Sequence, residues 1–442
     1  MADDAAPDHA PDHAPDHAHG HSHDHADLDV NARVRRVLDI VAIVLAAVTV
    51  AGMFWTVRDR DPIRLSSDFP DGVHRAVVES VALGPCTGTG PDGPECQITT
   101  FRLRDGPDAG ETRTQEFGRL ATATRSLRTG DEVVLYRYDD TEPPNDYVYA
   151  DRERRATLWW LALLFAGVIV VLGRWRGLAA LAGLVASLIV ILQYMLPALL
   201  DGRDPVIVAV LAATAIAYLA LYLAHGFNPL TTVALLGTIL ALGLTALLSW
   251  LFTSAAHFTG LATEEALTLD AYFAGIDFVG LILAGTVIGA LGALDDMTVT
   301  QASAVAELHA ANPLLSAREL YIRALRIGRD HISSTVNTLA LAYAGASLPT
   351  LLLFEISGQS LGSVLNGEVI AVELVRTLVG SIGLAASVPL TTALAAFVVR
   401  AGIHETGRHA PETSRRSVRR RRDRRDRPAP ETENDEEQFW RR

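Results

Sequence analysis

Charged residues stand at the ends of two long apolar runs, and they are the first candidates for chemistry in this sequence. Asp295 and Asp296 follow a glycine-spaced apolar segment, and Arg329, Asp330 and His331 precede another apolar run. A charge beside hydrocarbon is costly, so residues in such places are candidates for function by default. Carboxylates together with an imidazole can bind a cation or relay a proton. These residues are therefore candidates for an ion path or its gate.

A structural explanation of the two aspartates stays open. The apolar helix is expected to end just before them, at its cytoplasmic end, where the helix dipole disfavours carboxylates. Asp296 or Thr298 could then cap a second helix, Val299–Ala311, by bonding free backbone N–H groups. Residues 295–331 are accordingly expected to form a cytoplasmic amphipathic segment.

A further helix start is predicted beyond this point. Ser316 and Glu319 have the spacing of a capping box. Arg323, Arg326 and Arg329 recur every three residues and so share one helix face. That face is expected to turn toward the aspartates, because both groups should lie at the cytoplasmic interface; arginines that reach lipid phosphates are the alternative.

Four more polar residues belong to the same candidate path. Gln301 follows the aspartates, Asn337 lies in the next apolar run, and Glu373 and Arg376 lie in the last one. Glu373 and Arg376 are three residues apart, so they can pair on one helix face. A structural ion pair that only fixes helix packing is the alternative.

No catalytic set is found. The sequence lacks a nucleophile elbow, a phosphate-binding loop, a dinucleotide-binding glycine motif and a zinc-protease motif. We therefore expect neither an enzyme nor a bound cofactor.

Composition predicts a polytopic membrane protein. The chain has 442 residues, 49% of them hydrophobic, and several apolar runs reach the length of about 20 residues that spans a bilayer. Its net charge of −13 gives no reason to expect a nucleic-acid partner. About eight membrane helices are predicted from the apolar runs, at residues 38–57, 157–173, 177–199, 205–224, 230–252, 273–294, 332–354 and 369–399.

Arginine placement predicts the orientation of these helices. All basic side chains are arginines, and those between the spans gather in the segments that lie inside when the N-terminus is cytoplasmic. We expect both termini in the cytoplasm of a bacterial cell, with the protein in the plasma membrane. The expected parts are an anchor at 33–57 and a seven-helix membrane domain at 156–400.

Residues 58–155 are expected to form a small extracytoplasmic domain between the first and second spans. Short alternating stretches separated by Gly, Pro and Asp predict about five strands, in an OB-like barrel or a sandwich. Cys86 and Cys96, the only cysteines, both lie there, so export would allow a disulfide between them.

Both ends of the chain read as disordered tails, at 1–32 and 401–442. The first alternates histidine with aspartate, and a flexible chain of this kind can chelate a divalent metal; a tolerated low-complexity tail is the alternative. The second is rich in arginine and then acidic, and its arginines can lean on anionic lipid headgroups. The metal candidates of the first tail are His17, His19, His21, His23 and His25.

Three segments resemble the YibE/F family of bacterial polytopic membrane proteins: GALGALDDMTVTQASAVAEL at 289–308, LRIGRDHISSTVNTLALAYAGASLP at 325–349 and GEVIAVELVRTLVGSIGLAASVPLTTALAA at 367–396. The resemblance covers about residues 33 to 405 and leaves out both tails. It implies a multi-pass membrane protein that is transporter-like, and it assigns no substrate.

Two functions are compatible with these features. The first is a secondary transporter or channel for a small solute or ion, with a divalent metal as one candidate, because charges inside membrane helices mark ion paths. The second is a membrane scaffold or envelope-signalling protein whose external domain binds a partner. The intramembrane charges favour transport.

Overall fold

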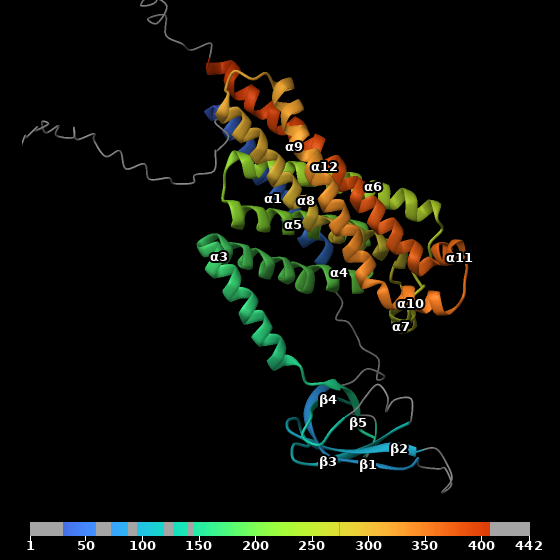
Figure 1. Cartoon of the computed structure of the whole chain (residues 1–442). Coiled ribbons are helices and arrows are strands. Elements are labelled where there is room, and N and C mark those ends of the chain that lie inside the picture. Colours follow the sequence, from blue (N-terminus) through green and yellow to red (C-terminus); the bar gives the residue numbers. More distant parts are fainter. Residues whose placement is uncertain are drawn as a thin grey trace, which may run out of the picture.

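The computed structural model describes residues 30–58, 72–86, 95–118, 127–138, 141, 143, 145–273 and 275–406, with the backbone alone for 402–406. The chain forms a helical bundle and a separate curled sheet (Figure 1). Within the described part, six helices are long and apolar enough to cross a membrane, or up to seven if one bent helix pair counts as a span. The protein is therefore a multi-pass membrane protein. The described part has six or seven candidate spans, whereas hydropathy predicts eight.

The first helix, α1 (Ala32–Val57), leads into the bundle. Asn31 caps it, because its side chain accepts a hydrogen bond from the Val34 backbone N–H at 2.9 Å. Near the other end, the hydroxyl of Thr56 lies 3.0 Å from that of Tyr194. Hydrogen bonds between side chains of neighbouring helices are one of the forces that hold helices together in lipid.

Five antiparallel strands form the curled sheet: β1 (Gly72–Pro85), β2 (Glu95–Leu103), β3 (Thr112–Phe117), β4 (Glu132–Arg137) and β5 (Tyr147–Arg152). Their order in the sheet is β3-β2-β1-β4-β5. The two edge strands curl toward each other, and the Gln115 side chain of β3 joins them. It accepts a hydrogen bond from the Tyr149 N–H at 2.9 Å and donates one to the Tyr147 carbonyl.

The interior of the sheet holds an ion pair as well as apolar side chains. Arg113 donates two hydrogen bonds to Asp146, at 2.8 and 2.9 Å, and its guanidinium carbon lies 5.5 Å from the centre of the Tyr147 ring. These bonds hold the pKa of Asp146 below its ordinary range. Burial, followed by a hydrogen bond to Asp108, raises the pKa of Tyr147 to about 12. A bidentate arginine–carboxylate pair of this kind is geometrically specific.

Cys86 and Cys96 are joined by a disulfide between the end of β1 and the start of β2, with a Cα–Cα distance of 4.9 Å. The two strands pair up to Pro85 opposite Glu95, the pair after Gly84 opposite Cys96. The disulfide therefore closes the hairpin where its ladder ends.

The next helix, α3 (Arg155–Val190), contains a sharp turn. Arg174 has φ 51° and ψ −131°, a conformation that a residue with a Cβ rarely adopts. The chain doubles back at this residue and brings Gly177 against Ile169. A Cβ on Gly177 would overlap the Ile169 carbonyl oxygen, whereas the two residues would be far apart in a straight helix. Figure 1 shows the two arms of α3 meeting in a sharp V. The π-helical turn η1 (Ile191–Met195) and α4 (Leu196–Leu200) continue the second arm.

Two capped helices follow, α5 (Pro205–His225) and α6 (Pro229–Ala255). Each starts with proline after a capping side chain. Asp204 accepts from the N–H of Val206 at 2.9 Å, and Asn228 accepts from that of Thr231 at 2.8 Å. Proline suits the first helical turn because its missing N–H would be unbonded there.

The next helix, α8 (Phe278–Ala311), corrects the sequence analysis. It does not end before Asp295, and no new helix is capped by Asp296 or Thr298. The Thr298 hydroxyl instead bonds back to the Asp295 carbonyl at 3.0 Å, inside one continuous helix. The reason is that neither proline nor glycine occurs between Asp295 and Pro313, and two carboxylates alone do not end a helix.

The helix α9 (Ala317–Ala346) is likewise longer than expected. It joins the end of the expected amphipathic segment, 295–331, to the start of the expected span at 332–354. The capping box at its start is confirmed, since Ser316 and Glu319 bond each other's backbone N–H groups. A bend of 60° separates it from α10 (Leu348–Ile356). Pro349 lies in the first turn of α10, where it prevents the helix of α9 from continuing.

The last long helix, α12 (Glu368–Thr406), runs through Pro389 without a break. Short helices α7 (Glu264–Tyr272) and α11 (Leu361–Asn366) lie with α10 at the end of the bundle opposite the start of α1 (Figure 1). Glu368 fastens the loop before α7, because its carboxylate accepts from the N–H groups of Thr259 at 2.8 Å and Gly260 at 2.7 Å.

Removing the Arg113–Asp146 pair should destabilise the sheet. We expect Asp146→Ala to cost about 3 kcal/mol, because it leaves a buried guanidinium without its main partner. Hydrogen exchange of the sheet amides in the detergent-solubilised chain measures this. Glu79→Ala, which removes an exposed ion pair with Arg102, is the control and should lower the protection much less. Equal protection in both variants would contradict the assignment.

The same pair predicts an acid-labile sheet. The pKa of Asp146 is lowered by folding, so its stabilisation is complete above the unfolded pKa of about 3.9 and is lost as the pH falls through the folded pKa. We expect protection of the sheet amides to fall in this acidic range in the wild type, and to change less with pH in Asp146→Asn. A pH dependence equal in both proteins would assign it to other carboxylates.

Gly177 should not tolerate a side chain. We expect Gly177→Ala to lower the melting temperature of the solubilised protein, because the new Cβ meets backbone rather than a side chain that can move. Gly173→Ala is the matched control, since a Cβ there has nothing within 4 Å. Tryptophan fluorescence during heating reports both. Similar melting of the two variants would show that the arms of α3 separate freely.

Candidate functional site

Asp295 lies within the bundle and is half-buried, because it lines a cavity. The hydroxyl of Thr238, on α6, contacts its carboxylate and also lies 2.8 Å from the hydroxyl of Thr298. Thr238 is about 13 Å along α6 from its start at Pro229, at 1.5 Å per residue. Oδ1 of Asp295 is buried and accepts no hydrogen bond from the described residues. A carboxylate with an unbonded oxygen among membrane helices is a candidate site for a proton or a cation.

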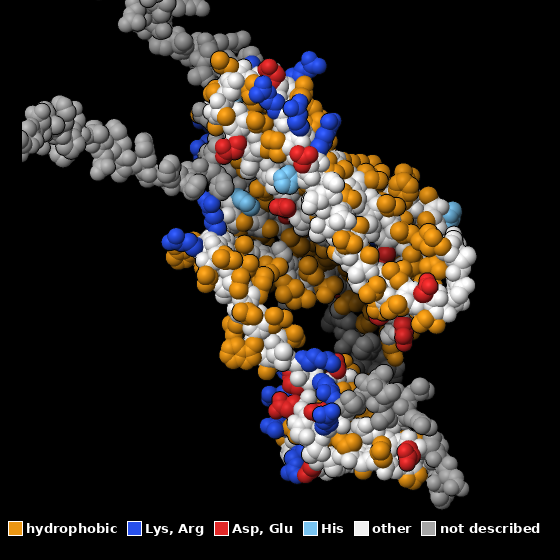
Figure 2. Space-filling model, in the orientation of Figure 1, with side chains coloured by type: hydrophobic (Ala, Val, Ile, Leu, Met, Phe, Trp, Pro, Cys, Tyr) orange, Lys and Arg blue, Asp and Glu red, His pale blue; other side chains and the backbone are white. Residues whose placement is uncertain are grey.

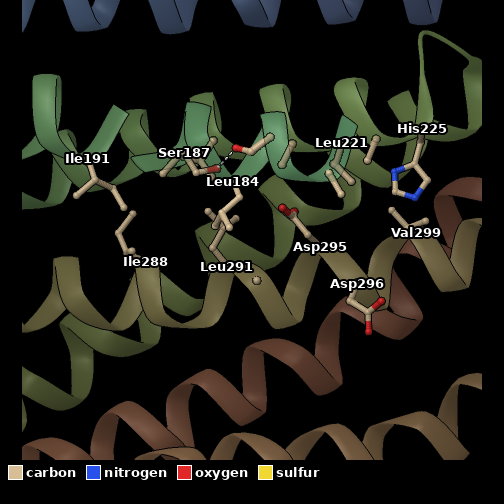
Figure 3. A pocket seen from close by; sticks show the side chains of 16 residues that line it. Leu184, Ser187, Ile191, Leu221, His225, Ile288, Leu291, Asp295, Asp296 and Val299 are labelled. Carbon is tan, nitrogen blue, oxygen red and sulfur yellow. Dashed lines mark hydrogen bonds between the residues drawn. The ribbon is translucent and has the colours of Figure 1, made fainter. Parts of the chain in front are cut away.

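A cavity of about 430 Å³ lies beside this carboxylate. It is bounded by the second arm of α3 with η1, by α5 and by α8 (Figure 3). Its walls are mostly apolar, as with Leu184 and Leu291, and Ser187 adds a hydroxyl that donates to its own helix at 2.8 Å. Asp296 and His225 lie toward one end of it, and Asp296 is exposed. Polar groups are therefore concentrated at that end.

On its other side, Asp295 borders a row of hydroxyls on α6. We call this row the hydroxyl stripe; all five of its members are at most 1% exposed. They occupy one face of α6, within about 80° at 100° per residue. They are Thr231, Thr238, Thr245, Ser249 and Thr253. The sequence analysis missed this stripe, although the seven-residue spacing of its first three members was readable.

Gln301 is one of the predicted residues that the fold brings into the core. It is fully buried on α8, and its carbonyl oxygen accepts a hydrogen bond from the Thr392 hydroxyl of α12 at 2.9 Å. Its Nε2 donates to no described group. Gly328 of α9 makes room for it, because a Cβ there would lie 2.5 Å from Nε2.

Glu373 and Arg376 form an ion pair on α12, with 2.6 Å between Arg376 Nη1 and Glu373 Oε1. Their side chains are 29% and 23% exposed, so the pair is half-buried. The guanidinium lies over Gly285 of α8, and the hydroxyl of Tyr343 lies over Gly289. This glycine step therefore admits polar side chains from α12 and α9.

The remaining predicted residues are not part of this site. Arg329, Asp330, His331 and Asn337 are exposed on α9, because the buried Gly328 sets which face of that helix meets α8. Among the described residues, no arginine of α9 forms an ion pair with Asp295 or Asp296. The expected cluster of α9 arginines with the aspartates is thus not formed.

The histidine tail, with its metal candidates, lies outside the described residues. Within the described part, no group of three or more His, Cys, Asp and Glu side chains has an arrangement that could hold a metal ion. The chemical character of the described site is therefore that of a carboxylate between an apolar cavity and a row of hydroxyls.

The helical bundle corresponds to a known family. A family profile described as YibE/F-like protein matches residues 161–401, which is more than half of the chain. Comparison with curated proteins and with solved structures gave no significant match. The match includes α5, α6, α8, α9 and most of α12, and so contains Asp295, the cavity and the hydroxyl stripe. The chain belongs to the YibE/F-like protein family.

Proposed function

We propose that this protein is a secondary transporter or channel for a small solute or ion, and that Asp295 is its central charged group. One observation carries the proposal: Asp295 lines a cavity of about 430 Å³ while one of its carboxylate oxygens is buried without a hydrogen bond. A structural carboxylate within a membrane is expected to be paired. An unpaired one is suited to take up a proton or a cation during each cycle.

The cavity favours a small occupant. Its apolar walls would accept the carbon skeleton of a solute, while Asp295 and Asp296 would attract a positive group. A divalent metal remains a candidate substrate, because carboxylates and the His225 imidazole are metal ligands. With no preformed group of three ligands in the described part, such a metal would keep part of its water shell during passage.

The number and direction of the membrane spans are also part of this proposal. Counting the two arms of α3 separately, and α9 with α10 as one bent span, gives the eight spans that the apolar runs predict. Packing supports alternating directions of the spans. Gly237 of α6 meets Thr391 of α12, and Thr245, further along α6, meets Gly383, which comes earlier in α12, so the two helices run antiparallel. We place both termini in the cytoplasm and the sheet outside the plasma membrane, following the arginines.

The sheet favours a second candidate function. Its strand order, with Gln115 bridging β3 and β5, supports an OB-like barrel as part of this proposal, and OB folds bind ligands on their surface. A scaffold or envelope-signalling role, in which this domain binds a partner outside the cell, is the alternative. That role does not explain the unbonded oxygen of Asp295.

Flux through purified protein tests the proposal. Proteoliposomes are loaded with a panel of Zn²⁺, Mn²⁺, Ni²⁺ and small anions, with and without a pH gradient. We expect wild-type flux of a panel member and a loss of about tenfold to 100-fold in Asp295→Asn, the effect of losing a charged interaction of about 1.5–3 kcal/mol. Asp330→Asn, an exposed carboxylate outside the cavity, is the control and should keep its flux. If Asp295→Asn transports as well as wild type, Asp295 is not the central group.

Labelling of introduced cysteines tests the topology. Leu314, 90% exposed between α8 and α9, should lie inside, and Gln359, exposed beyond α10, should lie outside. We expect a membrane-impermeant maleimide to label Gln359→Cys on intact cells and Leu314→Cys only on inverted vesicles. The native cysteines are disulfide-bonded and should not react. The opposite pattern would reverse the orientation.

A further inference from the structure

The hydroxyl stripe continues well beyond the cavity. Thr231 lies in the first turn of α6 and Thr253 lies in the last, so the stripe runs the length of the span. In lipid, hydroxyls of this kind commonly bond their own helix, as Thr245 does to the Ala241 carbonyl at 2.8 Å. Ser249 and Thr253 differ, because their hydroxyl oxygens bond no described group although both are buried.

The facing helix α12 adds polar atoms with the same property. Thr391 is fully buried opposite Gly237, and its hydroxyl oxygen also bonds no described group. Buried polar atoms are almost always bonded to protein or to ordered water, so several exceptions along one seam need an explanation. Packing alone does not supply it, because alanine or valine would fill the same space.

The seam is narrow. A Cβ on Gly383 would overlap the Thr245 hydroxyl, and one on Gly237 would overlap that of Thr391. There is no room for a hydrated metal ion or for a solute of the size that the cavity accepts. A proton needs no such room, because a hydroxyl can accept one and donate another in place.

Titratable groups lie at both ends of the part of the stripe that runs from Thr238 to Thr253. At one end, Thr238 contacts Asp295, with Asp296 and His225 as the other titratable groups around that carboxylate. At the other end, the antiparallel register of α6 and α12 puts Thr253 level with about residue 375, at the height of the Glu373–Arg376 pair. Tyr343 of α9 is a further titratable group near that pair, and Glu368 bonds the loop that follows α6.

We propose that the hydroxyl stripe conducts protons between the Glu373 end of the bundle and Asp295, which makes the proton the coupling ion of the transport proposed above and rests on that function. Each hydroxyl oxygen binds an incoming proton and releases its own to the next acceptor, so it is regenerated. Asp295 takes the last proton and passes it to the cavity. The path requires one water in each step of about 6 Å between Thr245, Ser249 and Thr253, and two in the step of about 10 Å from Thr245 to Thr238.

Proton entry into proteoliposomes tests this role without a solute. A K⁺ gradient with valinomycin sets an inside-negative potential, and a trapped pH dye reports acidification. We expect wild type to acidify the lumen at least about tenfold faster than protein-free vesicles, and Thr245→Val/Ser249→Ala/Thr253→Val to fall to their rate. Thr214→Val is the matched control, since Thr214 is a buried hydroxyl of α5 that bonds its own helix at 2.7 Å; it should match wild type.

A milder pair keeps the test decisive if the triple variant does not fold. Ser249→Ala should slow proton entry, and Ser249→Thr, which keeps a hydroxyl, should not. Two results would overturn the proton path. One is proton entry into wild-type vesicles that is no faster than into protein-free vesicles; the other is entry in Ser249→Ala and in the triple variant that is as fast as in wild type.

Solute counterflow, which needs no net proton movement, separates this inference from the proposed function. We expect the triple variant to retain counterflow and Asp295→Asn to lose it. If Asp295→Asn loses counterflow but the triple variant keeps its proton entry, the proton path along the stripe is overturned and the solute transport is not. Proton entry that depends on the stripe, in a protein that carries no panel solute, overturns the solute function alone.

Discussion

The close approach of α6, α8 and α12 is the constraint on which the rest of the bundle depends. Lipid tails are as apolar as leucine, so helices in a bilayer are held by tight packing and by polar contacts between them. Here both occur together: Thr238 meets Thr298, and glycines on α6 and α12 make room for threonines on the opposite helix. The same contacts bury the hydroxyl stripe and hold Asp295 against it.

The continuity of α8 follows from a second constraint. Backbone N–H and C=O groups have no partner in hydrocarbon, so a helix that ended at mid-depth would leave several of them unbonded. Running on through Asp295 and Asp296 avoids that cost and turns the two carboxylates about 100° apart. Asp295 then faces α6 and the cavity wall, and Asp296 reaches the exposed end of the cavity.

Local patterns predicted much of the fold. The five strands, the capping box at Ser316 and the position of α1 follow from alternation, cap chemistry and apolar length. Of the site, the i,i+3 pair of Glu373 and Arg376 was predictable from spacing alone. The prediction that the helix ends before Asp295 is wrong. The polar partner of the Asp295 carboxylate is Thr238, which is far away in sequence. That contact depends on tertiary packing, which local pattern does not contain.

The position of Asp295 between two different environments gives it a role that neither environment provides alone. The cavity is wide and largely apolar, whereas the stripe is narrow and made of hydroxyls. A protonated Asp295 is neutral and is stable against both; an ionised one needs a cation, which only the cavity has room to supply. Two ligands that favour different charge states of one group compete for it, and each shifts the population toward the state it binds. Under the proton path proposed above, a proton arriving by the stripe would thus release a cation to the cavity, which is the exchange that a coupled transporter requires.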